Sequence, residues 1–150
     1  MNAYTNQYMV NTIKSASPEQ LLLMLYDGAI RFAALGVKAI DANDFEKRSY
    51  YVNKTSAIIS ELAATLDHSL DPDFADNLDA LYHYMLNNLM DANLKHDTRP
   101  LLEVKKMLGE LRETWSQAME INRSQKQKES VPIPAAAAGP ASCKPLAVAM

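Results

Sequence analysis

The chain has 150 residues, of which 48% are hydrophobic and 22% charged, with a net charge of −3. These values are typical of one globular domain, and they lack the basic excess that nucleic-acid binding requires. One cysteine, Cys143, cannot form an internal disulfide and is expected to be an exposed bystander. Because the sequence has neither a basic and apolar leader nor an uninterrupted apolar run of about 18 residues, we expect a cytoplasmic protein without membrane insertion.

Residues 1–16 form the first predicted region. They carry apolar and aromatic side chains at roughly helical spacing, namely Tyr4, Tyr8, Met9, Val10 and Ile13. We expect this segment to fold back over the rest of the protein as a short cap, and Tyr4, Tyr8 and Ile13 to belong to a protein-binding surface. A displaceable cap and a permanent packing segment both fit the sequence.

Residues 17–123 are predicted to form four helices. The first runs from Pro18 to about residue 42, behind a capping box of Ser17 and Gln20. The second begins at Asn43, capped together with Glu46, and runs to about residue 70. The third spans about 72–95 and the fourth about 99–123. Connections of three or four residues reverse the chain, so the predicted fold is all-α, an antiparallel up-down four-helix bundle.

Each predicted helix carries an apolar seam whose members step by three or four residues, which places them on one face. In chain order, the seams comprise Leu22, Leu25, Ala29, Phe32, Gly36 and Ile40; Val52, Ile59, Leu62 and Leu66; Phe74, Leu78, Leu81, Met85 and Leu89; and Leu101, Val104, Leu108, Leu111, Trp115 and Ala118. Residues 124–150 turn into a Pro/Ala-rich sequence without periodicity, and we expect a disordered tail.

Helical bundles often carry di-iron sites. Such sites need glutamate three residues before histidine, and His68, His83 and His96 all lack it. The sequence also has no Gly-rich phosphate loop and no favoured Ser-His-Asp spacing. We therefore expect no metal, no cofactor and no enzymatic activity.

The sequence carries more apolar surface than four seams require. Residues 21–26 are apolar all round the helix, where a solvent-facing helix should show a polar stripe. Second apolar stripes stand beside the seams of the next two helices. The candidate protein-binding residues in the first three predicted helices are Leu23, Tyr51, Ile58, Leu62, Tyr82 and Leu86. They could line a groove for a partner segment, although a thick bundle that buries wide stripes explains the same pattern.

Several separated motifs resemble those of one family. They are residues 16–29 (ASPEQLLLMLYDGA), 77–85 (NLDALYHYM), 92–94 (ANL), 102–104 (LEV) and 111–115 (LRETW). Together with Tyr4 and Tyr8, they make residues 1–122 similar to the flagellin export chaperones of the FliS family. Residues 124–150 depart from the family's common pattern.

The resemblance implies an antiparallel four-helix bundle in the cytosol of a flagellated bacterium. It implies a chaperone that binds the C-terminal helical segment of flagellin one-to-one, prevents premature polymerisation and helps to deliver the subunit to the export gate. It also implies that the N-terminal segment covers part of the binding surface. The alternative is another helical-bundle interaction module that binds a flagellar regulator or acts as a scaffold.

Overall fold

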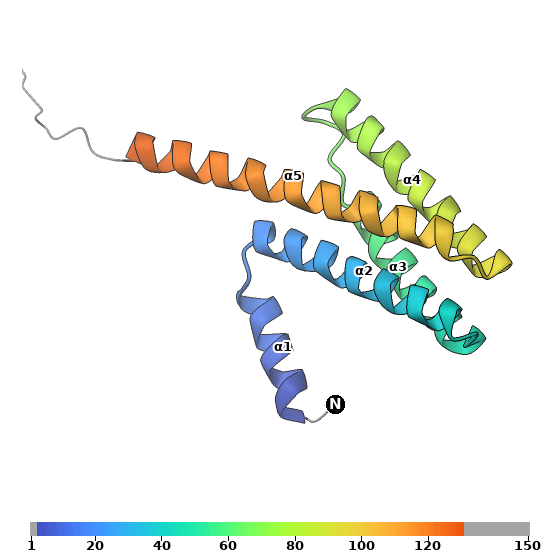
Figure 1. The fold of residues 1–150 in the computed structure, drawn as a ribbon. Coiled ribbons are helices and arrows are strands. Elements are labelled where there is room, and N and C mark those ends of the chain that lie inside the picture. The colour runs from blue at the N-terminus through green and yellow to red at the C-terminus, as the bar shows by residue number, and fades with distance from the viewer. Residues whose placement is uncertain (1–2, 131–150) are drawn as a thin grey trace, which may run out of the picture. The chain divides into compact units, whose positions relative to one another are not determined.

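The computed structural model describes residues 3–130, and within this range it contains five helices and no strand. In chain order the helices are α1 (Ala3–Ser15), α2 (Pro18–Asp41), α3 (Phe45–Ala64), α4 (Pro72–Lys95) and α5 (Thr98–Ser130) (Figure 1). The chain divides into two compact units, Met1–Trp115 and Ser116–Met150, so that α5 begins in the first and ends in the second. The prediction of an all-α protein is confirmed, whereas those for Cys143 and for the tail beyond residue 130 lie outside the described residues.

The start of α2 follows the sequence prediction. Ser17 has an extended backbone, and its hydroxyl accepts a hydrogen bond from the amide of Gln20 at 3.1 Å. The Gln20 side chain in turn accepts from the amide of Ser17 at 3.0 Å, which completes the capping box. Pro18 occupies the first helical turn, where a missing amide proton costs nothing.

Both predicted ends of the second long helix, α3, were wrong. Its cap is Asp44, which accepts from the amide of Lys47 at 3.0 Å, and not Asn43, which has the left-handed φ of 54°. The helix ends at Ala64 and not near residue 70. Just beyond it, the Asp67 carboxylate accepts from the amide of Ser69 at 2.9 Å. This local bond competes with helix continuation, which is why the chain turns there.

The last helix, α5, is longer than predicted. Residues 124–130, assigned to the tail from sequence, are helical. They consist mainly of Lys, Gln and Glu, which favour helix, and no proline interrupts them.

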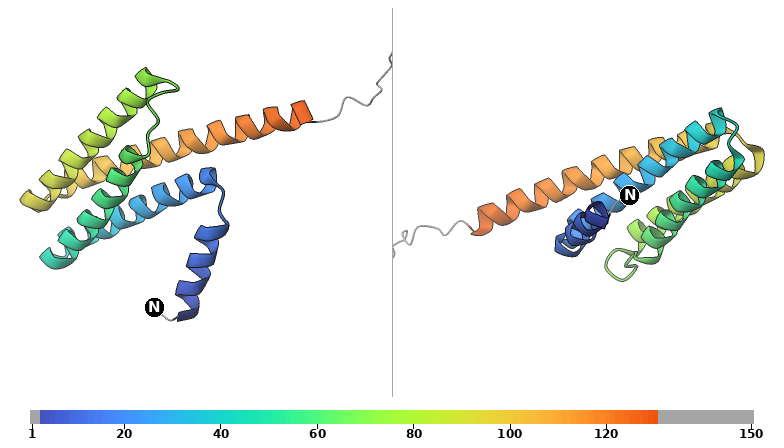
Figure 2. Two further views of the ribbon diagram at one scale, coloured as in Figure 1. Left: turned by 180° about the vertical axis from the view of Figure 1, so that it is seen from behind. Right: turned by 90° about the horizontal axis from the view of Figure 1, so that it is seen from below.

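Helices α2 to α5 share one core, and α1 contributes no buried residue to it. Figures 1 and 2 show α3 lying beside both α2 and α4. The buried cluster comprises Tyr26, Ala29, Ala33 and Ile40 from α2; Val52, Ile59 and Leu62 from α3; Leu78, Tyr82, Met85, Leu89 and Ala92 from α4; and Leu101, Val104 and Leu108 from α5. We call residues 17–115 the helical body.

The predicted seam of α4 needs correction. Phe74 and Leu81 are 52% and 40% exposed, whereas Tyr82, predicted to lie on a second stripe, is buried. Tyr82 can be buried because its hydroxyl finds a hydrogen-bond partner in Tyr26. In α5, Ala118 is exposed rather than part of the seam.

Among the described residues, α2 is the one helix whose length and composition would allow it to cross a membrane. Charged residues, including Asp27 and Arg31, interrupt its apolar sequence, which is why it contains no unbroken apolar run. The face of α2 that carries Tyr26, Ala29 and Ala33 is buried against the other helices. Core helices of soluble proteins pass the same test, so the composition of α2 is no argument for a membrane.

Three helical glycines differ in the space around them, and alanine substitutions should separate them. A Cβ at Gly109 meets nothing within 4 Å, and one at Gly28 meets Ile58 at an ordinary 3.5 Å. Both Gly109→Ala and Gly28→Ala should raise the free energy of unfolding by up to about 1 kcal/mol, the helix preference of Ala over Gly.

In contrast, a Cβ at Gly36 would lie 2.9 Å from Leu101, which is fully buried. Gly36→Ala should gain less than the other two substitutions or lose stability, as measured by urea unfolding. An equal gain at all three positions would contradict the close approach of α2 and α5.

Deleting residues 1–15 should leave the helical body folded, because α1 buries no residue. We expect the thermal midpoint to change by no more than about 3 °C, the scale of a surface change. A larger fall, measured by circular dichroism, would show that α1 is the permanent packing segment.

Candidate functional site

A hydrogen-bonded chain of aromatic side chains lies in the core. The hydroxyls of Tyr26 and Tyr82 are 2.5 Å apart, and Trp115 Nε1 donates to the Tyr26 hydroxyl at 3.1 Å. Burial raises the pKa of both phenols. Both phenols therefore stay neutral near pH 7. The three hydrogen-bonded side chains tie α2, α4 and α5 together and do not supply an acid or a base.

The opposite end of the helical body is tied by His96. This residue ends α4 in the left-handed conformation, and its Nδ1 lies 3.0 Å from the guanidinium of Arg48. Since a guanidinium only donates, Nδ1 accepts and Nε2 carries the proton, which it donates to the side-chain oxygen of Asn43 at 3.1 Å. Arg48 also donates to Asn93 at 2.9 Å. These bonds fix the α2–α3 turn against the end of α4.

Within residues 3–130, no three His, Cys, Asp or Glu side chains lie close enough together to hold a metal ion. The features that stand out on the helical body are apolar. They fit contact with another protein chain better than they fit chemistry.

Part of the surplus apolar surface predicted from sequence lies on α2, where most apolar side chains outside the core are half-buried, while more large apolar side chains are exposed on α1 and α4. The buried face of α2 combines the small residues Ala29, Ala33 and Gly36 with the bulky residues Tyr26 and Ile40. Other bulky side chains of α2 stand at the edges of this face and are only partly covered. They include Leu22, Leu25, Ile30 and Val37. The helix therefore presents apolar side chains to solvent on both sides of its buried face.

One hollow, of about 350 Å³, lies at the start of α2. Its lining comes from the end of α1, the linker and the first turns of α2. The lining residues are Thr12, Ser15, Ala16, Gln20, Leu23 and Met24. The structure thus places Leu23, a predicted binding residue, where the N-terminal segment meets α2.

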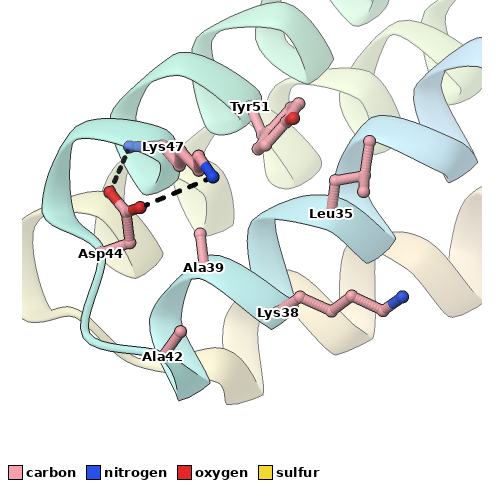
Figure 3. Close-up of a pocket in the computed structure, with 7 residues that line it drawn as sticks. All are labelled: Leu35, Lys38, Ala39, Ala42, Asp44, Lys47 and Tyr51. Atoms are coloured by element: carbon pink, nitrogen blue, oxygen red, sulfur yellow. Dashed lines mark hydrogen bonds and ion pairs between the residues drawn. The ribbon is translucent and has the colours of Figure 1, made fainter.

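A second hollow, of about 260 Å³, lies between the end of α2 and the start of α3 (Figure 3). Leu35 and Ala39 from α2, Ala42 directly after this helix, and Tyr51 from α3 make it apolar. Charged side chains complete its lining, namely Lys38, Asp44 and Lys47. Lys47 and Asp44 are 3.9 Å apart, joined by the ion pair drawn in Figure 3.

The predicted binding residues of α3 face α2. Ile58 reaches toward Gly28, and the ring of Tyr51 stacks on Phe32 with 6.2 Å between centroids. A different side of α3 meets α4, where Ser49 donates to Asn93 at 3.2 Å. Tyr51 and Ile58 therefore lie on the side of α3 that faces α2, which differs from the side that meets α4.

The remaining predicted residues are distributed between the core and the surface. Leu62 and Tyr82 are 2% and 1% exposed, so both side chains belong to the core. On α1, by contrast, Tyr4 and Tyr8 are 86% and 74% exposed. Leu86, on α4, is half-buried and packs against the shared core.

Sequence reasoning missed Leu35, Lys38 and Lys47 of the second hollow. One signal could have found both lysines, because Lys38 stands seven residues after Arg31, and Lys47 stands seven residues before Lys54. Seven residues make two helical turns, which puts the members of each pair on one face.

Comparison with known proteins gives this surface a context. Residues 1–122 match the family described as "Flagellar protein FliS". The chain belongs to the FliS family.

Three similar proteins carry the name flagellar secretion chaperone FliS. That of Bacillus subtilis (strain 168) is 36% identical over 122 residues, 81% of this chain and 90% of its own length. That of Campylobacter jejuni is 37% identical over 114 residues, 76% of this chain and 89% of its own. That of Salmonella typhimurium is 33% identical over 118 residues, 78% of this chain and 87% of its own. The FliS match covers the helical body and α1, and ends within α5.

The buried phenols of this FliS-family chain predict an alkaline limit to its stability. An unfolded tyrosine has a pKa of about 10, whereas burial raises the pKa of Tyr26 and Tyr82 above that value. Below pH 10 the phenols are neutral in the folded and in the unfolded state, and their contribution to the free energy of unfolding is fully present. Above it the unfolded state loses protons first, so the free energy of unfolding should fall as pH rises.

Tyr82→Phe should make this alkaline fall shallower and should cost about 1 kcal/mol near pH 7 through the lost hydrogen bond. Tyr8→Phe, at an exposed position, is the control and should change neither quantity. Urea unfolding between pH 7 and 11 measures both. An unchanged alkaline slope in Tyr82→Phe would show that the phenol is not buried in solution.

Proposed function

We propose that this FliS-family chain is a cytoplasmic secretion chaperone that holds the C-terminal helical segment of flagellin, one to one, until export. The names of its relatives support a role in flagellar secretion. The observation that carries the choice of partner is the partly covered apolar surface of α2 and α3, with one hollow between these helices and another where α1 meets α2. A segment that exists to self-associate exposes an apolar face, which aggregates unless another surface covers it.

We also propose that α2 to α5 form an antiparallel up-down four-helix bundle. Gly36 near the end of α2 faces Leu101 early in α5, whereas Tyr26 early in α2 meets Trp115 further along α5. As residue numbers rise on one helix they fall on the other, as expected for antiparallel neighbours. The short connection of residues 42–44 between α2 and α3 supports the same arrangement.

In this proposal Leu23, Tyr51, Ile58 and Leu86 contact the flagellin segment, while Leu62 and Tyr82 hold the surface in place. Helix α1 acts as a cap whose exposed side chains, including Tyr4, Tyr8 and Ile13, cover part of the surface when flagellin is absent. The chaperone then passes its cargo to a component of the export gate. The names of the relatives describe no catalysed reaction, and this role requires none.

The proposal is tested by measuring the affinity of the full chain for flagellin and for flagellin that lacks its C-terminal helical segment. Binding should require that segment. Ile58→Asp should weaken binding by at least about tenfold, because it places an unpaired charge where an apolar face must dock.

Leu94→Asp is the matched control, since Leu94 is 77% exposed at the end of α4, and it should bind normally. Thermal midpoints of both variants show whether the body remains folded. Equal binding of intact and truncated flagellin would reject the proposal.

A further inference from the structure

Three aromatic rings form a row across α2 and α3. The ring of Tyr51 lies 6.2 Å from Phe32 of α2 and 5.2 Å from Tyr50, measured between centroids. A cation stands over each end of the row: the Arg31 guanidinium is 5.3 Å from the Phe32 ring, and the Lys54 ammonium is 5.4 Å from the Tyr50 ring. The row is therefore apolar in its middle and positively charged at both ends.

The row continues into the second hollow, because Tyr51 belongs to both. Lys38 and Lys47 line that hollow, and they stand seven residues from Arg31 and Lys54 respectively. Two helical turns separate the members of each pair, so each helix carries two cations along one edge. We call the rings, the hollow and these four cations the basic groove.

Little in the structure neutralises this charge. Asp44 pairs with Lys47 at 3.9 Å, but its carboxylate already caps α3, and the Lys47 side chain is 68% exposed. Such a pair is weak in water. Lys38 makes no ion pair with any of the residues that the structure describes.

The geometry points to the basic groove as the seat of an amphipathic partner segment whose apolar face is flanked by carboxylates. This inference rests on the proposed function, in which a helical segment of flagellin occupies the same face of the chaperone. The rings and the hollow accept the apolar side chains. The four cations pair with carboxylates on either side and thereby set the position of the segment along the groove.

The chain's own ends carry no acidic side chains that would match the charge of the basic groove. Residues 1–17 contain no Asp or Glu and include Lys14, and residues 131–150 contain neither acid and include Lys144. A second copy could offer α4, where Asp73 and Asp76 stand beside the exposed Phe74. That contact would join two different surfaces and would build closed rings or open chains, neither of which suits a one-to-one chaperone.

The test uses the full chain and two amphipathic peptides of about 18 residues, long enough to span ~27 Å as a helix. Both have the same Leu/Phe face, which is flanked by Glu in one peptide and by Lys in the other. Binding is measured by fluorescence anisotropy at low and high salt. The wild type should prefer the Glu peptide by at least about tenfold, and the preference should shrink with salt.

A variant with Arg31→Gln, Lys38→Gln, Lys47→Gln and Lys54→Gln should lose this preference. The control changes the same number of charges on α5, with Lys105→Gln, Lys106→Gln, Lys126→Gln and Lys128→Gln, and should keep it. Circular dichroism checks that both remain folded. Lys38→Gln alone should reduce the preference about two- to fivefold, so the groove is tested even if the fourfold variant unfolds.

Equal binding of the two peptides by the wild type would overturn the inference. So would tighter binding to phosphatidylglycerol vesicles than to the Glu peptide, or oligomers of the wild type that the fourfold variant abolishes.

Flagellin is measured in parallel to separate the two claims. If the wild type and the fourfold variant bind flagellin equally well, the inference that flagellin binds in the basic groove is wrong, and the proposed function stands. If the Glu-peptide preference is confirmed but flagellin does not bind the wild type, the groove stands and the proposed function fails.

Discussion

The close approach of α2 to its neighbours is the constraint on which the rest of the structure depends. Ala29, Ala33 and Gly36 put little bulk between α2 and the helices that pack against it, and a Cβ at Gly36 would already meet Leu101 at 2.9 Å. Of the bulky residues of α2, Tyr26 and Ile40 enter the core, whereas those at the two edges of its buried face are only partly covered. The partly covered side chains at these edges leave an apolar surface that another chain can cover.

Two polar clusters hold this surface in a fixed shape. The hydroxyl pair of Tyr26 and Tyr82, with Trp115, joins three helices in the interior. At the far end, Arg48 and His96 lock the α2–α3 turn onto α4. The second cluster therefore fixes one end of the groove between α2 and α3, while the first anchors α2 to α4 and α5. A surface held in this way costs a partner less binding free energy to order.

Some elements were predictable because their signals are local. Ser17, Gln20 and Pro18 specify the start of α2 within four residues, and the structure agrees. The end of α3 was missed because Leu66 continues the apolar pattern, while the turn made by Asp67 overrides it. Local pattern could not reveal such competition between a side chain and the helix.

Tertiary partners explain the other errors. Tyr82 looks like a surface residue until Tyr26, 56 positions away, provides a buried partner for its hydroxyl. The candidate surface was predictable as an excess of apolar residues on α2, and Leu23, Tyr51 and Ile58 lie at hollows or against α2. Which flank of α3 faces α2 depends on the packing of the whole body, and so the charged edges of the groove were not foreseen.

Hydroxyl-radical footprinting with and without flagellin would test most directly whether a partner covers the α2–α3 face. Tyr50 on this face and Phe74 on α4 are 55% and 52% exposed, so they start from nearly equal accessibility. Binding should lower the oxidation of Tyr50, with its neighbours Phe32 and Tyr51, and leave Phe74 unchanged. Protection of Phe74 with continued oxidation of Tyr50 would contradict the account and place the partner on α4 instead.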